Sequence, residues 1–183
     1  MDQDSILSVQ KTSNGELSIA IRKLTINDID KRYCGWLNDS NVNRYLESRF
    51  TVWDINLLKE YFYEKDKSDI MIAIVDYETN THIGNIKIAS IDLLHGRAEI
   101  GIIIGDRKYW GKGVATIAIK MATHYCFTTL ALHKVTAGAY IENVASIKAF
   151  LNNDFIIEGE RKEHFLTPSG WTSAILLGKV NRY

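Results

Sequence analysis

Residues that break up a chain are scarce in this sequence of 183 residues. It has a single proline, Pro168, and no stretch rich in glycine, serine or proline of the kind that links domains. No apolar run approaches the roughly 18 residues of a membrane span, and the start, Met1 to Ser5, lacks the basic and apolar segments of a signal peptide. We therefore expect one domain over residues 1–183, with no membrane partner, in which residues 1–15 form an N-terminal extension that can add a strand.

An excess of charge of one sign is also missing, since 22 Lys and Arg balance 22 Asp and Glu. Proteins that bind nucleic acid through bulk electrostatics usually carry a basic excess, so the balance argues against a nucleic-acid partner. Cysteine is scarce as well, and Cys34 and Cys126 share no short metal-binding or redox spacing. This usage is typical of a reduced compartment, so we expect a cytoplasmic protein without a metal site.

Apolar residues make up 46% of the chain, and their periodicity predicts the elements. Period-two alternation and short apolar runs predict strands at residues 5–11, 16–24, 70–76, 82–90, 97–104, 133–140, 155–166 and 171–180. Helical periodicity and capping residues predict helices that start at Thr25 or Asn27, at 54–65 behind Asp54 or Thr51, at about 113–129, and from Asn143. The three middle strands fit an antiparallel meander. The order of elements indicates a mixed α/β fold rather than repeated βαβ units.

The most informative segment leads into the helix at about 113–129. Residues 107–116 read Arg-Lys-Tyr-Trp-Gly-Lys-Gly-Val-Ala-Thr and follow the apolar run Ile100 to Ile104. Glycines allow positive φ and close approach of a ligand to the backbone, and the first amides of a helix can bind an anion. The spacing fits neither the P-loop nor the dinucleotide fingerprint. It predicts a shorter turn that binds a phosphorylated cofactor.

Five segments together carry a resemblance to a known family. They are His-Ile-Gly-Asn-Ile at 82–86, Arg-Ala-Glu-Ile-Gly at 97–101, Tyr-Trp-Gly-Lys-Gly-Val-Ala at 109–115, Leu-His-Lys-Val at 132–135, and Glu-Asn-Val-Ala-Ser at 142–146 leading to Asp154-Phe155. From about residue 17 to 180 the chain resembles the GNAT superfamily of N-acetyltransferases. It looks most like the RimJ/RimL-like branch, which often has Trp where Trp110 stands, with spermidine acetyltransferases close by.

The resemblance implies an α/β fold with a mixed, mostly antiparallel sheet flanked by helices. Strands 97–104 and 133–140 would splay apart around acetyl-CoA, with its pyrophosphate on the amides of about residues 110–116 and its pantetheine arm along the first of these strands. Asn143 would reach the cofactor, cap its helix, or do both. Lys108 or Lys112 would add charge unless both are simply solvated. The implied cofactor-binding residues are Ile102, Ile103, Ile104, Lys108, Trp110, Gly111, Lys112, Gly113, Val114, Ala115, Thr116, Asn143 and Ser146.

Acetyl transfer to an amine needs a base for the amine and benefits from a proton for the leaving thiolate. We favour Glu99 as the base, because strand alternation places it on one face with Gly101, where a substrate has room; the alternative is an edge carboxylate paired with Arg97 or Lys87. Glu142 and Glu158 are weaker candidates. Many relatives carry a tyrosine acid where this chain has Phe150, so the acid role falls to Ser146, Tyr140, water, or no group.

The first helices and the last hairpin would build the acceptor side. The candidate residues that bind the acceptor are Trp36, Asp39, Tyr45, Glu47, Arg49 and His164, with Asn38, Trp53 and Trp171 nearby. We expect an acetyl-CoA-dependent N-acetyltransferase, a monomer or homodimer, that acts on a small amine, an amino sugar or a protein N-terminus. The alternatives are a non-catalytic acyl-CoA-binding or sensor domain, in which Phe150 marks lost chemistry, and a plain interaction module.

Overall fold

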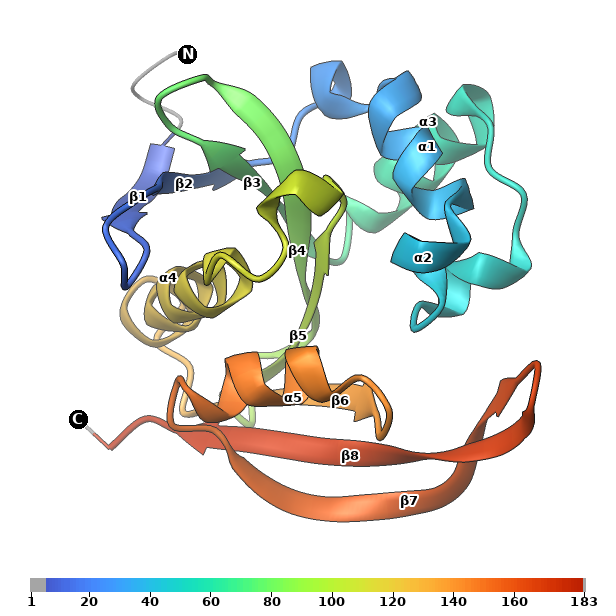
Figure 1. Ribbon diagram of the computed structural model, residues 1–183. Coiled ribbons are helices and arrows are strands. Elements are labelled where there is room, and N and C mark those ends of the chain that lie inside the picture. Colours follow the sequence, from blue (N-terminus) through green and yellow to red (C-terminus); the bar gives the residue numbers. More distant parts are fainter. Residues whose placement is uncertain (1–5, 183) are drawn as a thin grey trace.

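The computed structural model describes residues 6–182, so the first five residues of the predicted N-terminal extension and Tyr183 lie outside the described residues. One eight-stranded sheet runs through the molecule, with helices on both faces (Figure 1). The elements in chain order are β1 (Ile6–Lys11), β2 (Ser18–Lys23), the 3₁₀ helix η2 (Ile26–Asp28), α1 (Lys31–Asn38), α2 (Ser40–Asn43), the 3₁₀ helix η3 (Glu47–Phe50), α3 (Ile55–Lys65), β3 (Ile70–Asp76), β4 (Thr81–Asp92), β5 (Arg97–Ile104), the 3₁₀ helix η4 (Arg107–Tyr109), α4 (Val114–Thr128), β6 (Lys134–Tyr140), α5 (Val144–Leu151), β7 (Ile156–Thr167) and β8 (Gly170–Val180).

The strand order is β1-β2-β3-β4-β5-β6-β8-β7, and neighbours are antiparallel except for β5 and β6, which are parallel. Residues 6–11 of the predicted N-terminal extension form β1, which pairs antiparallel with β2. The predicted meander is present in β3, β4 and β5, and Thr167 pairs with Gly170 at the turn of the last hairpin. The mixed, mostly antiparallel sheet is therefore confirmed.

Each face of the sheet buries a separate apolar cluster. On one face α4 and α5 pack on β2 to β6, and the apolar residues of β5 that point there include Ile100 and Ile102. On the other face α1 and α3 cover β2 and β3, and Ile103 packs with them. Strand alternation of the kind the sequence shows thus divides β5 between two cores.

The helices begin at predicted capping residues, except for the first helix, whose predicted start was wrong. The helix predicted from Thr25 or Asn27 is only the 3₁₀ turn η2 there, and α1 begins at Lys31, because the Asp30 carboxylate accepts the amides of the first turn. The Asp54 cap of α3 is confirmed by its hydrogen bond from the Leu57 amide, 2.9 Å. Two elements of one turn each, α2 and η3, were not predicted from the sequence.

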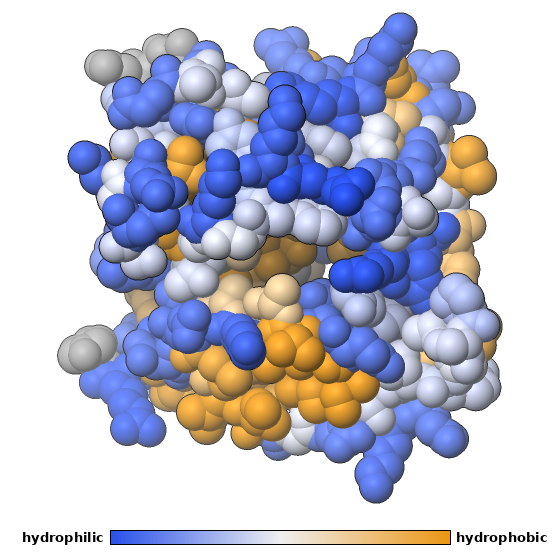
Figure 2. Space-filling view, in the orientation of Figure 1, coloured by the Kyte–Doolittle hydropathy of each residue, from blue (hydrophilic) through white to orange (hydrophobic). Residues whose placement is uncertain are grey.

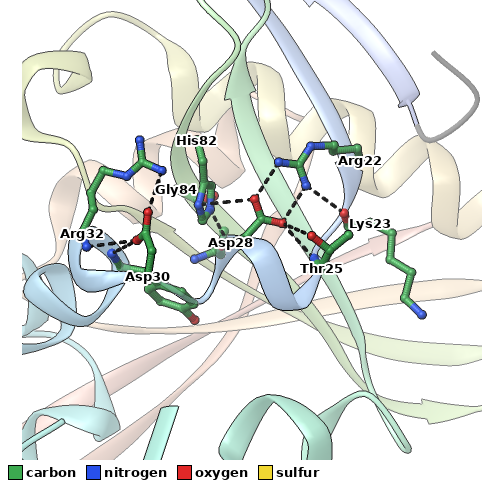
Figure 3. Close-up of polar contacts among 10 residues, drawn as sticks. Arg22, Lys23, Thr25, Asp28, Asp30, Arg32, His82 and Gly84 are labelled. Atoms are coloured by element: carbon green, nitrogen blue, oxygen red, sulfur yellow. Dashed lines mark hydrogen bonds and ion pairs between the residues drawn. The ribbon is translucent and has the colours of Figure 1, made fainter. Parts of the chain in front are cut away.

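A buried ion pair ties η2 to β2 and lies against β4 (Figure 3). The Arg22 guanidinium donates to both carboxylate oxygens of Asp28 at 2.7 Å, and the Thr25 amide donates to the same carboxylate at 2.8 Å. Burial raises the pKa of Asp28, but the Arg22 hydrogen bonds and the Thr25 amide outweigh it and lower the pKa below its usual value. The His82 imidazole lies next to this pair, with Nδ1 4.0 Å from Asp28.

Among residues 6–182, no helix combines the length and apolar character of a membrane span.

Candidate active site

The parallel strands β5 and β6 pair over a short stretch and then separate. Their ladder comprises only Arg97 with Lys134, Ala98 with Val135, and Glu99 with Thr136. Beyond it, β5 stays bonded to β4 and β6 stays bonded to β8, as far as Ile104 and Tyr140 respectively. The main-chain groups that face the gap are therefore open to a ligand amide. Figure 2 shows a hollow on this side of the molecule, above the apolar surface around α5.

The turn before α4, which we call the cofactor turn (residues 110–113), opens toward the same side. Gly111 and Gly113 have φ of 72° and 77°, in the left-handed region that favours glycine. At the start of α4 the Ile117 amide donates to the Gly113 carbonyl at 3.1 Å. The amides of Val114, Ala115 and Thr116 precede that bond and have no partner inside the helix. Left-handed glycines followed by a helix N-terminus form a concave anion site.

Aromatic side chains hold this turn in place. The Trp110 indole donates to the Ile104 carbonyl at 2.8 Å, and the Tyr109 hydroxyl donates to Asp76 at 2.8 Å. The Trp110 amide donates to the Arg107 carbonyl at 3.2 Å. The amides predicted to bind the pyrophosphate, residues 110–116, therefore exclude that of Trp110. Lys108 and Lys112 are exposed. Exposure is compatible with both predictions, a lysine that is only solvated and a lysine that binds the cofactor.

Trp36 does not lie with the other predicted acceptor residues. It is buried in the second core, where its ring contacts His82 edge-on at 5.0 Å between centroids. A Cβ on Gly105 would lie 1.9 Å from that ring. Trp36 therefore supports the start of the loop that leads to the cofactor turn.

Glu99 is exposed on the face of the sheet opposite α4 and α5. Its Oε1 lies 3.7 Å from the position of a Cβ on Gly138, so the carboxylate extends over the widening gap toward β6. The alternative pairing is not seen, because Arg97 binds Asp92 and Lys87 contacts the Tyr61 hydroxyl. Glu158 pairs with Lys134 at 2.7 Å instead.

The start of α5 borders the gap on the β6 side. Asn143 caps α5, with its side chain accepting the Ser146 amide at 3.3 Å, so the predicted capping role is confirmed. Phe150 is 1% exposed, and its ring meets Phe155 edge-on with centroids 5.0 Å apart. It is a core residue without a proton to donate. Asp154, just beyond α5, has φ of 61°, in the left-handed region.

Side chains from three distant segments meet at the far end of β6, and we call this group the acceptor cluster: Tyr45, Glu47, Arg49, Tyr140 and Phe165. The Tyr140 hydroxyl donates to the Glu47 carboxylate and accepts from the Arg49 guanidinium. Its ring stacks on Phe165 at 3.9 Å. Burial, followed by the hydrogen bond to Glu47, raises the pKa of Tyr140 to about 12, so the hydroxyl keeps its proton.

Arg49 makes further hydrogen bonds within the protein. Its guanidinium also donates to the carbonyls of Leu166, Arg44 and Leu46. Glu142, next to this cluster, accepts from the Thr172 hydroxyl, and its carbonyl accepts from Tyr45 at 3.3 Å. Three carboxylates, those of Glu47, Glu99 and Glu142, thus lie along this side of β6. Two guanidinium groups lie near them: Arg49 binds main-chain carbonyls and Tyr140, and Arg44 lies over the Tyr45 ring at 4.8 Å.

Other predicted acceptor residues have structural roles or lie at the rim. Asp39 caps α2 through the Asn41 amide, 2.9 Å. Asn38 and Trp53 bind each other, with the Trp53 amide donating to Asn38 at 2.9 Å. His164 is exposed beside Phe165, with ring centroids 4.8 Å apart. Phe165 was not predicted at all, and Tyr140 only as an acid, although alternation along β6 places Tyr140 on the face of Gly138.

Comparison with known proteins gives consistent matches. The family model described as acetyltransferase (GNAT) domain matches residues 18–156. The uncharacterized N-acetyltransferase p20 of Bacillus licheniformis is 30% identical over 152 residues, which are 80% of this chain and 83% of that protein. Spermidine N(1)-acetyltransferase of Escherichia coli K12 is 37% identical over 92 residues, half of this chain and 49% of that protein.

Among solved structures, the fold matches spermidine N-acetyltransferase from Vibrio cholerae in complex with CoA and spermine. The TM-score is 0.79 at 24% identity, over 88% of this chain and 95% of that one.

Proposed function

The chain belongs to the GNAT acetyltransferase family and is an acetyl-CoA-dependent N-acetyltransferase; we propose that its acceptor is a small aliphatic amine with at least one further positive charge, as polyamines have. The observation that carries the proposal is the set of carboxylates Glu47, Glu99 and Glu142 beside β6. Relatives named spermidine acetyltransferases support the same acceptor class. Among the small amine, the amino sugar and the protein N-terminus, this favours the first.

The geometry fits the cofactor on two independent observations. The cofactor turn combines two left-handed glycines with the N-terminus of α4, which suits a pyrophosphate. The separated edges of β5 and β6 offer main-chain groups to a pantetheine amide. When bound, acetyl-CoA supplies an acetyl group activated as a thioester. We assign its anionic part to the amides of residues 111–116, with Lys108 and Lys112 in reach of solvent around them.

Glu99 is the proposed base. Its exposed carboxylate over Gly138 can accept a proton from the bound ammonium, directly or through a water, so that the neutral amine attacks. Ser146, in the first turn of α5, is the proposed donor to the leaving thiolate, since Phe150 has no proton and the Tyr140 proton is given to Glu47. The amine acquires the acetyl group, and the thiolate leaves with the donated proton.

Glu47 is the proposed partner of the second positive charge of the acceptor. Tyr140 is two residues from Gly138 on the same strand face, a rise of about 6.6 Å. The Glu47 carboxylate, hydrogen-bonded to Tyr140, therefore lies further along the same face of β6 than Glu99, and we propose that a diamine spans the two carboxylates. One carboxylate would receive the reacting amine and the other would bind the distal ammonium.

The test is thiol release from acetyl-CoA with matched acceptors. We expect turnover with spermidine and 1,4-diaminobutane, and a kcat/KM for butylamine lower by about tenfold, as the loss of one charged hydrogen bond predicts. Glu47→Gln should lower kcat/KM for the diamine by a similar factor and leave that for butylamine unchanged. Preference for butylamine, for a seryl peptide or for an amino sugar nucleotide would refute the acceptor class. CoA binding without turnover on any amine would favour the sensor alternative.

A further inference from the structure

We propose a second small-molecule site, separate from the acetyl-transfer site, that takes a small organic anion with an apolar body. A cavity of about 960 Å³ lies between α4 and the C-terminal end of β8. These two segments lie next to each other near the C-terminus in Figure 1. Its volume is at the upper end of the range for small-molecule sites, roughly 300–1,000 Å³. The inference does not depend on the identity of the acceptor amine.

The cavity is distinct from the cofactor turn. Its walls come from β1, the middle and end of α4, the turn after α5, and the strands β7 and β8, and they begin on α4 only at Lys120. None of residues 110–116 lines it. The acceptor cluster lies at the opposite end of β8, where Phe165 pairs with Thr172. A ligand here would be neither the amine nor the pyrophosphate of the cofactor.

A buried hydroxyl on the wall lacks a partner. Thr123 is 3% exposed and lines the cavity, and within residues 6–182 its hydroxyl has no hydrogen-bond partner. A threonine inside a helix commonly donates to the carbonyl four residues earlier, as Thr128 does to His124 at 2.8 Å. Buried polar atoms are rarely left unpaired in proteins. A ligand oxygen would satisfy this hydroxyl.

The charges around the cavity leave a cationic surplus. Asp154 is neutralised by Lys179 at 3.2 Å, and Glu158 by Lys134 at 2.7 Å. Lys120 and Arg182 also line the cavity, and neither forms an ion pair with a described residue. Unpaired cations beside an unpartnered hydroxyl suit a carboxylate or phosphate.

The rest of the wall is apolar. Phe127 on α4, Ile156 on β7 and Val180 on β8 line the cavity, and Ile156 and Val180 are exposed apolar side chains. Apolar walls with a few convergent polar groups are typical of sites that bind organic ligands rather than bare ions. This combination gives the ligand class: an anionic group at Lys120, Thr123 and Arg182, and an apolar body against Phe127.

The experiment uses phenyl phosphate as the probe and benzylammonium as the matched ligand of opposite charge, titrated into the full-length protein saturated with CoA and followed by NMR. We expect saturable binding of phenyl phosphate only, with shifts at Thr123 and Phe127. Lys120→Gln should weaken it about tenfold, as the loss of one charged hydrogen bond predicts, and Thr123→Val about threefold, as for a neutral one. Lys67→Gln, an exposed lysine beyond α3, should leave the dissociation constant unchanged.

Several results would overturn the proposal. Displacement of the probe by CoA would make the cavity part of the cofactor site. Equal binding of benzylammonium, no saturable binding of phenyl phosphate, or equal affinity in Lys120→Gln and wild type would each mean that the cavity has no anion site. Because both variants lie outside the acetyl-transfer site, they should retain wild-type thiol release, which separates this result from any failure of the proposed acceptor.

Discussion

The two sides of the gap between β5 and β6 are built in different ways. The proposed cofactor side consists of main chain: two left-handed glycines, the first amides of α4 and the open edge of β5. The proposed acceptor side consists of side chains from distant parts of the chain, such as Glu47 and Tyr140, which are 93 residues apart in sequence. A cofactor side made of main chain can bind the same cofactor whatever the surrounding side chains are. An acceptor side made of side chains can change when the acceptor changes.

The difference has a consequence for substitutions. Main-chain donors are lost only when the backbone conformation changes, so the cofactor side is sensitive at its glycines and tolerant elsewhere. The acceptor side depends on each carboxylate and on the hydroxyl that holds it. Substitutions on the two sides should therefore affect the KM for different substrates.

The largest effect is expected for the residue between the two sides. Glu99→Gln should lower kcat with any amine by about 100-fold or more at neutral pH, because the amide cannot accept the ammonium proton. Steady-state thiol release measures it, and the KM for acetyl-CoA should stay near wild type. Glu60→Gln, an exposed carboxylate on α3, serves as the control. Activity retained in Glu99→Gln would exclude Glu99 as the base.

The cofactor side can be disrupted at Gly111 alone. Gly111→Ala should raise the KM for acetyl-CoA by about tenfold, because a left-handed alanine costs roughly 1–2 kcal/mol and shifts the amides that follow. Gly15→Ala is a matched control, since Gly15 has φ of 74° and open space around it, as Gly111 does. Both variants should lose similar free energy of unfolding, and only the first should lose cofactor affinity. Equal KM values for acetyl-CoA in the two variants would contradict the role of the turn.

The acceptor side can be loosened at Tyr140. Tyr140→Phe keeps the stacking on Phe165 and removes the hydroxyl between Glu47 and Arg49. The KM for the diamine should rise about fivefold, the usual worth of one hydrogen bond, with the KM for acetyl-CoA unchanged. A fall in kcat alone, with both KM values unchanged, would instead point to Tyr140 as the acid.

The smallest effect is expected on stability, at His82, which contacts Trp36 beneath the loop that leads to the cofactor turn. Burial lowers the pKa of His82, so the folded protein resists its protonation. At a pH above the ordinary histidine pKa of about 6.5, His82 is neutral in both the folded and the unfolded protein. As the pH is lowered below that value, the unfolded chain binds the proton first. The free energy of unfolding therefore decreases, by at most about 1.4 kcal/mol for each pH unit. Urea unfolding between pH 7 and 5 should show a shallower slope for His82→Gln. Parallel curves for variant and wild type would contradict this account.

Local features of the sequence predicted most strand positions and helix starts correctly. The strands 70–76 and 97–104 begin and end where the apolar runs placed them, and Asp54 and Asn143 cap the helices expected of them. These features depend on neighbours in sequence, through period and capping. The first helix was misplaced because Thr25 and Asp30 are both good caps: Thr25 begins only the 3₁₀ turn η2, and Asp30 begins α1, which packs on β2 and β3.

The sequence by itself determined the cofactor side, because glycine conformation, helix start and strand period are encoded within a few residues. It could not determine that Trp36 packs against Gly105 or that Phe165 stacks on Tyr140. Nor could it determine that the Arg49 guanidinium donates to the Leu166 carbonyl. Those contacts join residues far apart in the chain, and only the packing of α1, α2 and the β7–β8 hairpin around the sheet brings them together. The tertiary structure therefore decided the proposed acceptor side, the part of the site that we expect to select the amine.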